Sequence, residues 1–228
     1  MRILELFSGT ASFSKVAEEM GHKVTTLDWD SKFGAEICMD ILDIDLNEID
    51  VLFGEHFDVV WASPPCTEYS HAKRSGVRNI QEANKVVEKT IAIIKKLNPK
   101  FWIVENPQTG LLKNQNFMKN IPFIDVSYCK YGMPYRKQTR LWTNLKFQGK
   151  TCHRDCAFMN GKKHIGSVGN GRRKYTDKSY KLTEKYAVPR ALCTEILQEI
   201  ARLHDSQQEI SVHQKPIEPA DARKGEGK

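Results

Sequence analysis

A cysteine and a glutamate each follow a strand-like segment of the chain. Cys66 ends the sequence Ser-Pro-Pro-Cys, directly after the apolar segment 57–62, and Glu105 directly follows the segment 101–104. The two prolines before Cys66 forbid a helix or a central strand, so the thiol is expected on a stiff loop. Taken alone, Cys66 could be a buried, inert cysteine. Paired with a nearby carboxyl group, it could serve as the nucleophile of a covalent reaction.

Strand-like and helix-like segments alternate along the chain. The expected strands are 2–7, 23–28, 57–62 and 101–104, and the expected helices are 11–20, 80–97 and 187–203. This alternation predicts a doubly wound α/β fold of the Rossmann-like type, with a mostly parallel sheet. Ligands of such folds bind outside the carboxyl ends of the strands. The sequence places Gly9, Asp28, Cys66 and Glu105 at those ends.

The turn after the first strand and the acid after the second strand suit a nucleoside. Gly9 allows a close approach of the backbone, and the helix that follows directs its N-terminal N–H groups into the cleft. Asp28 can accept hydrogen bonds from ribose hydroxyls. Trp29 could stack on an adenine ring or simply pack against the protein. An ordinary tight turn is the alternative for Gly9, because one glycine is no dinucleotide fingerprint.

Six short motifs, taken in order, resemble those of the cytosine C5-methyltransferase family. They lie at residues 6–9, 28–29, 40–41, 63–66, 105–106 and 138–140, and a fainter match to the family's closing motif lies at 186–189. The resemblance implies a DNA methyltransferase that uses S-adenosylmethionine. It also implies that the target base is flipped out of the duplex or is unpaired, because its ring atoms are inaccessible in a stack.

The resemblance assigns a role to each polar group of these motifs. Cys66 would add to C6 of cytosine, and Glu105 would contact N3 and offset the charge that builds on the ring. Arg140, together with Gln138, would place a cationic fork near the pyrimidine O2 or a neighbouring phosphate. The residues implied at the cofactor are Phe7, Ser8, Gly9, Thr10, Asp28, Trp29, Asp40, Ile41, Pro65 and Val188.

The chain is predicted to have a catalytic core with a reduced recognition lobe. We assign residues 1–148 to the core, 149–176 to a short basic lobe, 177–204 to the closing motif and final helix, and 205–228 to a disordered tail. Only about forty residues separate Trp142 from Tyr186, where family members carry a long recognition region. Two charge runs of the lobe, 161–164 and 171–174, could grip phosphates or be merely solvated.

The lobe also contains residues that could bind a metal. Cys152, Cys156 and His164 offer sulfur and imidazole ligands for a tetrahedral zinc ion. The alternative is two free cysteines and a surface histidine.

Composition favours an intracellular protein with a polyanionic partner. Lys and Arg number 35 against 28 Asp and Glu, which gives a net charge of +7 and a pI near 9.0. Mild basicity without a ligand is the alternative. The six cysteines lack the density of a disulfide scaffold, and no apolar run reaches membrane-spanning length. We therefore expect a monomer in the cytoplasm, and the compact chain is typical of a viral or phage protein that acts in a host cell.

Three functions fit these observations. The first is a DNA cytosine C5-methyltransferase, and the second is an RNA or tRNA methyltransferase of the same chemistry. The third is a catalytically silent nucleic-acid-binding homologue, against which the presence of both Cys66 and Glu105 argues.

Overall fold

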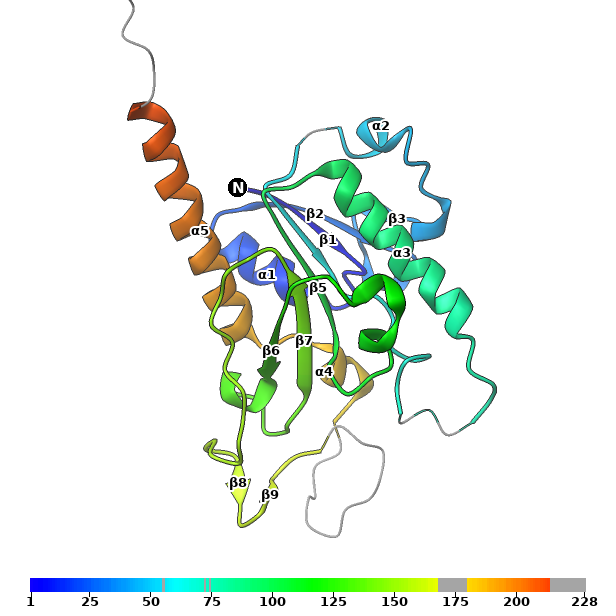
Figure 1. Cartoon of the computed structure of the whole chain (residues 1–228), viewed down its shortest axis with the longest axis vertical. Coiled ribbons are helices and arrows are strands. Elements are labelled where there is room, and N and C mark those ends of the chain that lie inside the picture. The colour runs from blue at the N-terminus through cyan, green and yellow to red at the C-terminus, as the bar shows by residue number, and fades with distance from the viewer. Residues whose placement is uncertain (55, 72, 74, 168–179, 214–228) are drawn as a thin grey trace, which may run out of the picture.

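A seven-stranded sheet forms the centre of the molecule (Figure 1). The computed structural model describes residues 1–54, 56–71, 73, 75–167 and 180–213. The strand order is β3-β2-β1-β4-β5-β7-β6, and β7 runs antiparallel to both of its neighbours while the other pairs are parallel. The strands are β1 Arg2–Leu6, β2 Lys23–Asp28, β3 Ile37–Cys38, β4 Val59–Ala62, β5 Phe101–Pro107, β6 Phe123–Ser127 and β7 Gln138–Thr143. The predicted doubly wound α/β fold is confirmed.

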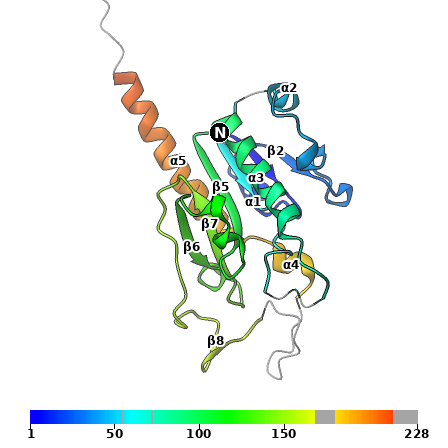
Figure 2. The ribbon, with the colours of Figure 1, turned by 45° about the vertical axis from the view of Figure 1, so that its right-hand side comes forward.

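Helices cover both faces of this sheet (Figure 2). The α-helices are α1 Ser12–Glu19, α2 Ile49–Phe53, α3 Ile80–Leu97, α4 Leu182–Tyr186 and α5 Arg190–His213. One core joins α1 and α5 to the sheet, and a second core joins α2 and α3 to the other face. Because every central strand packs on both sides, strands such as β4 are buried along their whole length.

The long helix α3 shows how local sequence sets these elements. The side chain of Asn79 accepts a hydrogen bond from the backbone N–H of Glu82 at its first turn. Val87, Ile93 and Ile94 form its buried face. The helix ends at Asn98, which has the left-handed conformation (φ 44°) and precedes Pro99. Periodicity and terminal signals therefore agree, and the predicted range 80–97 is confirmed.

The predicted lobe begins with irregular chain and a short hairpin. The hairpin consists of β8 Met159–Asn160 and β9 Lys163–His164, and it projects beyond the end of the sheet in Figure 1. A bridge between Tyr135 and Gly166 returns the chain to the core. The second charge run, 171–174, lies outside the described residues.

The predicted tail is helical over its first part. Helix α5 continues to His213 rather than ending near His204, so a disordered segment starting at residue 205 is wrong. Polar composition suggested disorder, but the sequence contains no glycine or proline between Ala191 and Lys215 that would end a helix. Residues 214–228 lie outside the described residues. None of the described helices is long and apolar enough to cross a bilayer.

Candidate active site

A cavity of about 360 Å³ opens at the carboxyl ends of β1, β2, β4 and β5. This is where a doubly wound sheet binds its ligands. Of the residues predicted at the cofactor or the substrate, the cavity is lined by Phe7, Ser8, Gly9, Thr10, Asp28, Trp29, Pro65, Cys66, Glu105 and Val188. The topology thus brings together residues from opposite ends of the chain.

The turn between β1 and α1 is held in an unusual conformation. Phe7, Gly9 and Ala11 all have positive φ, at 58°, 48° and 53°. Such conformations cost free energy in residues other than glycine and concentrate at functional sites. The carboxylate of Asp28 accepts a hydrogen bond from the backbone N–H of Gly9 at 2.8 Å and another from that of Asp30 at 3.0 Å. Asp28 therefore fixes the turn as well as facing the cavity.

A second carboxyl group, Glu5, lines the floor of the cavity and was not predicted. Its carboxylate accepts a hydrogen bond from the backbone N–H of Ser14 at 2.9 Å and a short one from the Ser14 hydroxyl. Burial raises the pKa of Glu5 to about 7. Its place inside an apolar strand could have signalled a functional acid, because an unpaired buried carboxyl group is costly.

Cys66 lies half-buried on a loop that is tied to the sheet. The side-chain amide of Asn106 donates a hydrogen bond to the backbone carbonyl of Pro64 at 2.9 Å, which fixes the loop on β5. Burial raises the pKa of the Cys66 thiol, and the positive charge of Lys137 partly opposes this effect. The thiol form therefore predominates at neutral pH, and Lys137 is the group that favours the thiolate.

Glu105 is contacted by one hydroxyl and one ammonium group. The hydroxyl of Tyr128 donates a hydrogen bond to Oε1 of Glu105 at 3.0 Å. Nζ of Lys137 lies 3.5 Å from the same oxygen atom. Burial raises the pKa of Tyr128 well above its ordinary value, so its hydroxyl remains a donor. A thiol, a carboxyl group and a cation thus share one wall of the cavity.

Arg140 and Gln138 do not line this cavity, so the structure does not bring the predicted cationic fork to it. Leu141 is the partner of Glu105 across the β5–β7 pair, so these two residues share a face of the sheet. Because side chains alternate along a strand, Arg140 points to the opposite face, and Gln138 shares that face. Arg140 forms a bidentate ion pair with Asp125 at 2.7 and 2.8 Å. The cavity-lining cation beside Glu105 is Lys137, the residue that precedes Gln138.

Asp40 and Ile41 also lie outside the cavity lining. The carboxylate of Asp40 accepts a hydrogen bond from the backbone N–H of Leu42 at 2.9 Å and caps the 3₁₀ helix η2 (Ile41–Asp43). Ile41 is buried in the core beneath α3. The local sequence uses both residues for a turn and for packing, so the structure does not support their predicted contact with a cofactor.

The predicted metal ligands come together in the lobe. Cys152, Cys156 and His164 lie with Cys129, and the four ligand atoms are within 4.8 Å of one another. Cys129 belongs to the 3₁₀ helix η5 (Tyr128–Tyr131) and is remote from the others in sequence, so spacing gave no signal for it.

The fold is that of a doubly wound α/β protein, and the cavity lies at the carboxyl ends of its strands, where such folds bind their ligands. The similar solved structures include a protein described as a DNA modification methyltransferase encoded within an E. coli prophage, with a TM-score of 0.51 and 18% identity. That match covers 63% of this chain and 46% of the other, so this chain spans less than half of that structure. The S. pombe Dnmt2 methyltransferase matches with a TM-score of 0.47 and 16% identity, over 66% of this chain and 52% of that chain.

Sequence comparison gives the family. The model of the C-5 cytosine-specific DNA methylase family matches residues 1–135. A protein of Frog virus 3 (isolate Goorha), described as a probable DNA (cytosine-5)-methyltransferase, is 35% identical over 221 residues. The aligned region covers 86% of this chain and 99% of that protein. The chain therefore belongs to the C-5 cytosine-specific DNA methylase family.

Proposed function

We propose that this protein transfers a methyl group from S-adenosylmethionine to C5 of cytosine in DNA, through a covalent bond between Cys66 and C6. The observation that carries the proposal is that the thiol of Cys66 and the carboxyl group of Glu105 line the same cavity as the β1–α1 turn and Asp28. A nucleophile and a nucleoside-binding wall thus meet in one space.

The cavity residues suit S-adenosylmethionine, which supplies an electrophilic methyl group when bound. Asp28 ends β2 with a carboxylate, the acceptor that ribose hydroxyls need. The indole of Trp29 is 65% exposed beside it, and an aromatic face left open to solvent is available for stacking on adenine. The cavity volume of about 360 Å³ falls within the range of small-molecule sites.

The chain's own residues would activate the cytosine ring. The Cys66 thiol loses its proton to solvent, and the thiolate adds to C6, which makes C5 electron-rich. Glu105 would contact N3, with Tyr128 and Lys137 holding its carboxyl group. Once C5 carries the methyl group and the cofactor is left as S-adenosylhomocysteine, solvent would take the C5 proton. The C–H electron pair would then form the C5–C6 double bond as the C6–S bond breaks, which restores the ring and the Cys66 thiolate.

The proposed partner is DNA, and the remaining expectations concern the state of the protein. The net charge of +7 favours a polyanion. None of the six cysteines forms a disulfide, which suits a reducing cytoplasm and a thiol nucleophile, and we propose that the protein acts there as a monomer. A zinc ion would lie outside the methyl transfer, because Cys152, Cys156 and His164 do not line the cavity.

A trapping experiment tests the proposal. In 5-fluorocytosine a fluorine atom takes the place of the C5 hydrogen, and a base cannot remove it as it removes a proton. The final elimination is therefore blocked, and DNA containing 5-fluorocytosine should form a stable adduct with the wild-type protein in the presence of S-adenosylmethionine. Cys66→Ser should form no adduct and transfer no methyl group to unmodified DNA, because a hydroxyl is a far weaker nucleophile. Cys38→Ser, which alters an exposed cysteine, is the matched control and should behave as wild type.

The same assay separates the alternatives. Methylation of RNA but not of DNA would identify the substrate as RNA. Turnover by Cys66→Ser, or an adduct at another cysteine, would contradict the covalent mechanism.

A further inference from the structure

We propose that Cys129, Cys152, Cys156 and His164 bind one zinc ion that fixes the basic lobe to the catalytic core. Three thiolates and one imidazole are a common ligand set of structural zinc sites. The ligands come from three separate places: η5, the irregular chain after β7, and strand β9. A shared ion would join all three.

The distances fit a tetrahedral site. With Zn–S bonds of about 2.3 Å and Zn–N bonds of about 2.0 Å, neighbouring ligand atoms lie about 3.5 to 3.8 Å apart. Sγ of Cys152 is 3.4 Å from Nε2 of His164, and none of the four ligand atoms is more than 4.8 Å from another. Small side-chain adjustments would therefore complete the site without moving the backbone.

The chain around Cys152 is held by local contacts. Arg154 has a positive φ of 69°, which turns the chain between Cys152 and Cys156, and the backbone N–H of Cys152 donates a hydrogen bond to the hydroxyl of Ser127 at 3.0 Å. The carboxylate of Asp155 accepts a hydrogen bond from the backbone N–H of His153 at 3.0 Å and pairs with Lys130 at 2.7 Å. Such surrounding contacts orient metal ligands and tune their charge.

Over residues 151–165, the described part of the lobe has no apolar core that could order it by itself. Between residues 151 and 165, Cys152 is the single buried residue, and its partners Cys156 and His164 are half-buried. So little burial offsets little conformational entropy, whereas metal binding supplies folding free energy directly. Between residues 151 and 165, the most buried point is thus a member of the ligand cluster.

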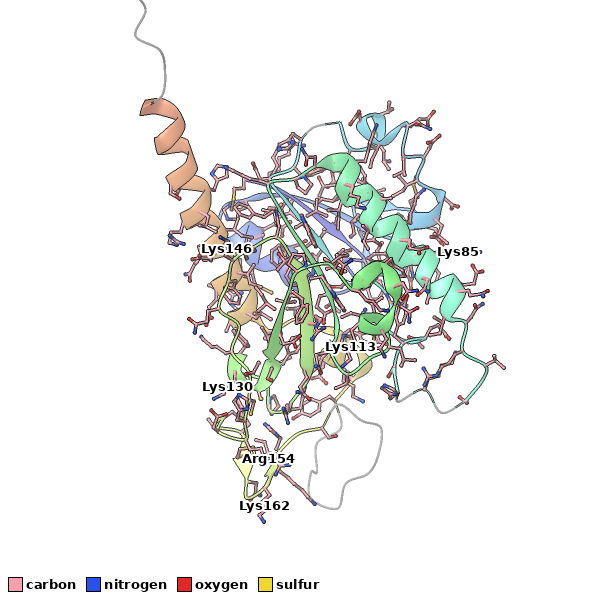
Figure 3. All side chains as sticks on the ribbon, viewed as in Figure 1. Lys85, Lys113, Lys130, Lys146, Arg154 and Lys162 are labelled. Carbon is pink, nitrogen blue, oxygen red and sulfur yellow. The ribbon has the colours of Figure 1, made fainter. Side chains whose placement is uncertain are left out.

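Charge at the site is also balanced. Zinc binding displaces three thiol protons to solvent and leaves a centre with a net charge of −1. Lys130 forms an ion pair with Asp155, which adjoins Cys156 in the chain. Arg136 and Arg154 lie close enough to His164 to act on it electrostatically. Figure 3 labels Lys130 and Arg154 around this part of the molecule.

The same ion would stabilise the wall of the active site. Cys129 follows Tyr128, whose hydroxyl contacts Glu105 and whose backbone N–H donates to the carbonyl of Lys137 at 3.0 Å. Beyond His164, the backbone N–H of Gly166 donates to the carbonyl of Pro134 at 2.8 Å. Zinc thus holds together both segments that flank Lys137, and its loss should loosen the lobe and this wall.

Metal analysis of the full chain tests the site independently of activity. Protein purified under reducing conditions should contain about one zinc per chain, and the cobalt-substituted protein should show the intense d–d absorption of a tetrahedral thiolate site. Cys156→Ser and His164→Gln, which alter half-buried ligands, should each lower zinc affinity by about tenfold or more. Cys38→Ser should retain full metal content, because this exposed cysteine lies outside the cluster. Chelation should make the lobe sensitive to protease while the sheet stays protected.

Three results would overturn the proposal. The first is protein without stoichiometric metal in which all six thiols react freely. The second is a metal-free protein with two fewer free thiols when no reductant is present, which would indicate a disulfide within the cluster. The third is a folded Cys129→Ser variant, judged by circular dichroism, that keeps wild-type zinc affinity. Since none of these readouts depends on methyl transfer, failure of the proposed activity would leave the test intact.

Discussion

Lys137 is the side chain that opposes burial at the Cys66 thiol. Because burial raises the pKa of this thiol and the charge of Lys137 lowers it, removing the charge should raise the pKa further. Lys137→Gln should therefore slow the alkylation of Cys66 by iodoacetamide at about pH 8 by roughly two- to tenfold. Lys162→Gln, on the exposed tip of the lobe, is the control. An unchanged pH profile in Lys137→Gln would show that this charge does not act on the thiol.

Glu5 should make the stability of the protein depend on pH. Its pKa is raised from 4.5 to about 7, mainly by burial, so the folded state binds a proton more tightly than the unfolded state. The resulting stabilisation is present below about pH 4.5 and is lost as the pH rises to about 7, with an upper limit of about 3 kcal/mol.

The variant Glu5→Gln removes this titration while keeping an oxygen that can accept from Ser14. Urea unfolding across pH 5 to about 7.5 should show a flatter profile for the variant, which gains stability relative to wild type as the pH rises. If the stability of the two proteins changes with pH in the same way, a group other than Glu5 causes the pH dependence.

At the scale of elements, two aspartates have different roles: Asp28 ends β2 and lines the cavity, whereas Asp40 follows β3 and caps η2. Asp28→Ala should weaken S-adenosylmethionine by about 1 to 3 kcal/mol, because a charged acceptor is lost and Gly9 loses the partner that fixes the turn. Asp40→Ala should leave cofactor affinity unchanged and cost about 1 kcal/mol of stability, since it only caps η2. Calorimetric titration compares the two. If both variants lose the same affinity for S-adenosylmethionine, Asp40 contacts the cofactor after all.

Sequence reasoning worked where a local rule decides the outcome. Helix α3 follows from the helical spacing of its apolar residues and from the Asn-Pro that ends it, and the loop of Cys66 follows from two prolines after a buried strand. Such signals lie within a few neighbouring residues. The order of parallel strands then places the ends of β1, β2, β4 and β5 together.

The differences between the expected and the observed placement of side chains depend on contacts between residues that are distant in the sequence. Lys137 and Arg140 are both cations near one strand, and only the antiparallel register of β5 and β7 decides which one reaches Glu105. Cys129 joins the cluster of the lobe because η5 folds beside it, which no spacing rule expresses. Asp40 and Ile41 match a family motif. In the structure, however, Asp40 caps a turn and Ile41 packs in the core.

At the scale of the whole molecule, positive charge should hold the nucleic-acid backbone through the lobe. Figure 3 labels Lys130, Arg154 and Lys162 in this region and Lys85 on α3, away from it. Affinity for a DNA duplex should fall steeply with salt concentration, and Lys162→Gln should reduce the slope of the log–log plot by about 1. Lys85→Gln, which removes another exposed charge, paired with Glu82, should not change the slope. A change of slope in Lys85→Gln alone would place the DNA on α3.

The enzyme should recognise only a short DNA sequence around its target cytosine. The described part of the lobe offers cations rather than an ordered surface for reading base edges. The hairpin has two residues in each strand, with Lys162 in its turn and Lys163 at the start of β9. Phosphate contacts position a duplex without reading its sequence, so the cytosine context should extend over about two or three bases. Single-stranded or distorted cytosines should react at least as well, because less stacking must be broken to reach C5 and C6. Sequencing of methylated products from a random-sequence duplex library, with a single-stranded library beside it, measures both properties. A strict target of about six or more base pairs would show that the lobe reads bases directly, since phosphate contacts alone cannot produce such a target.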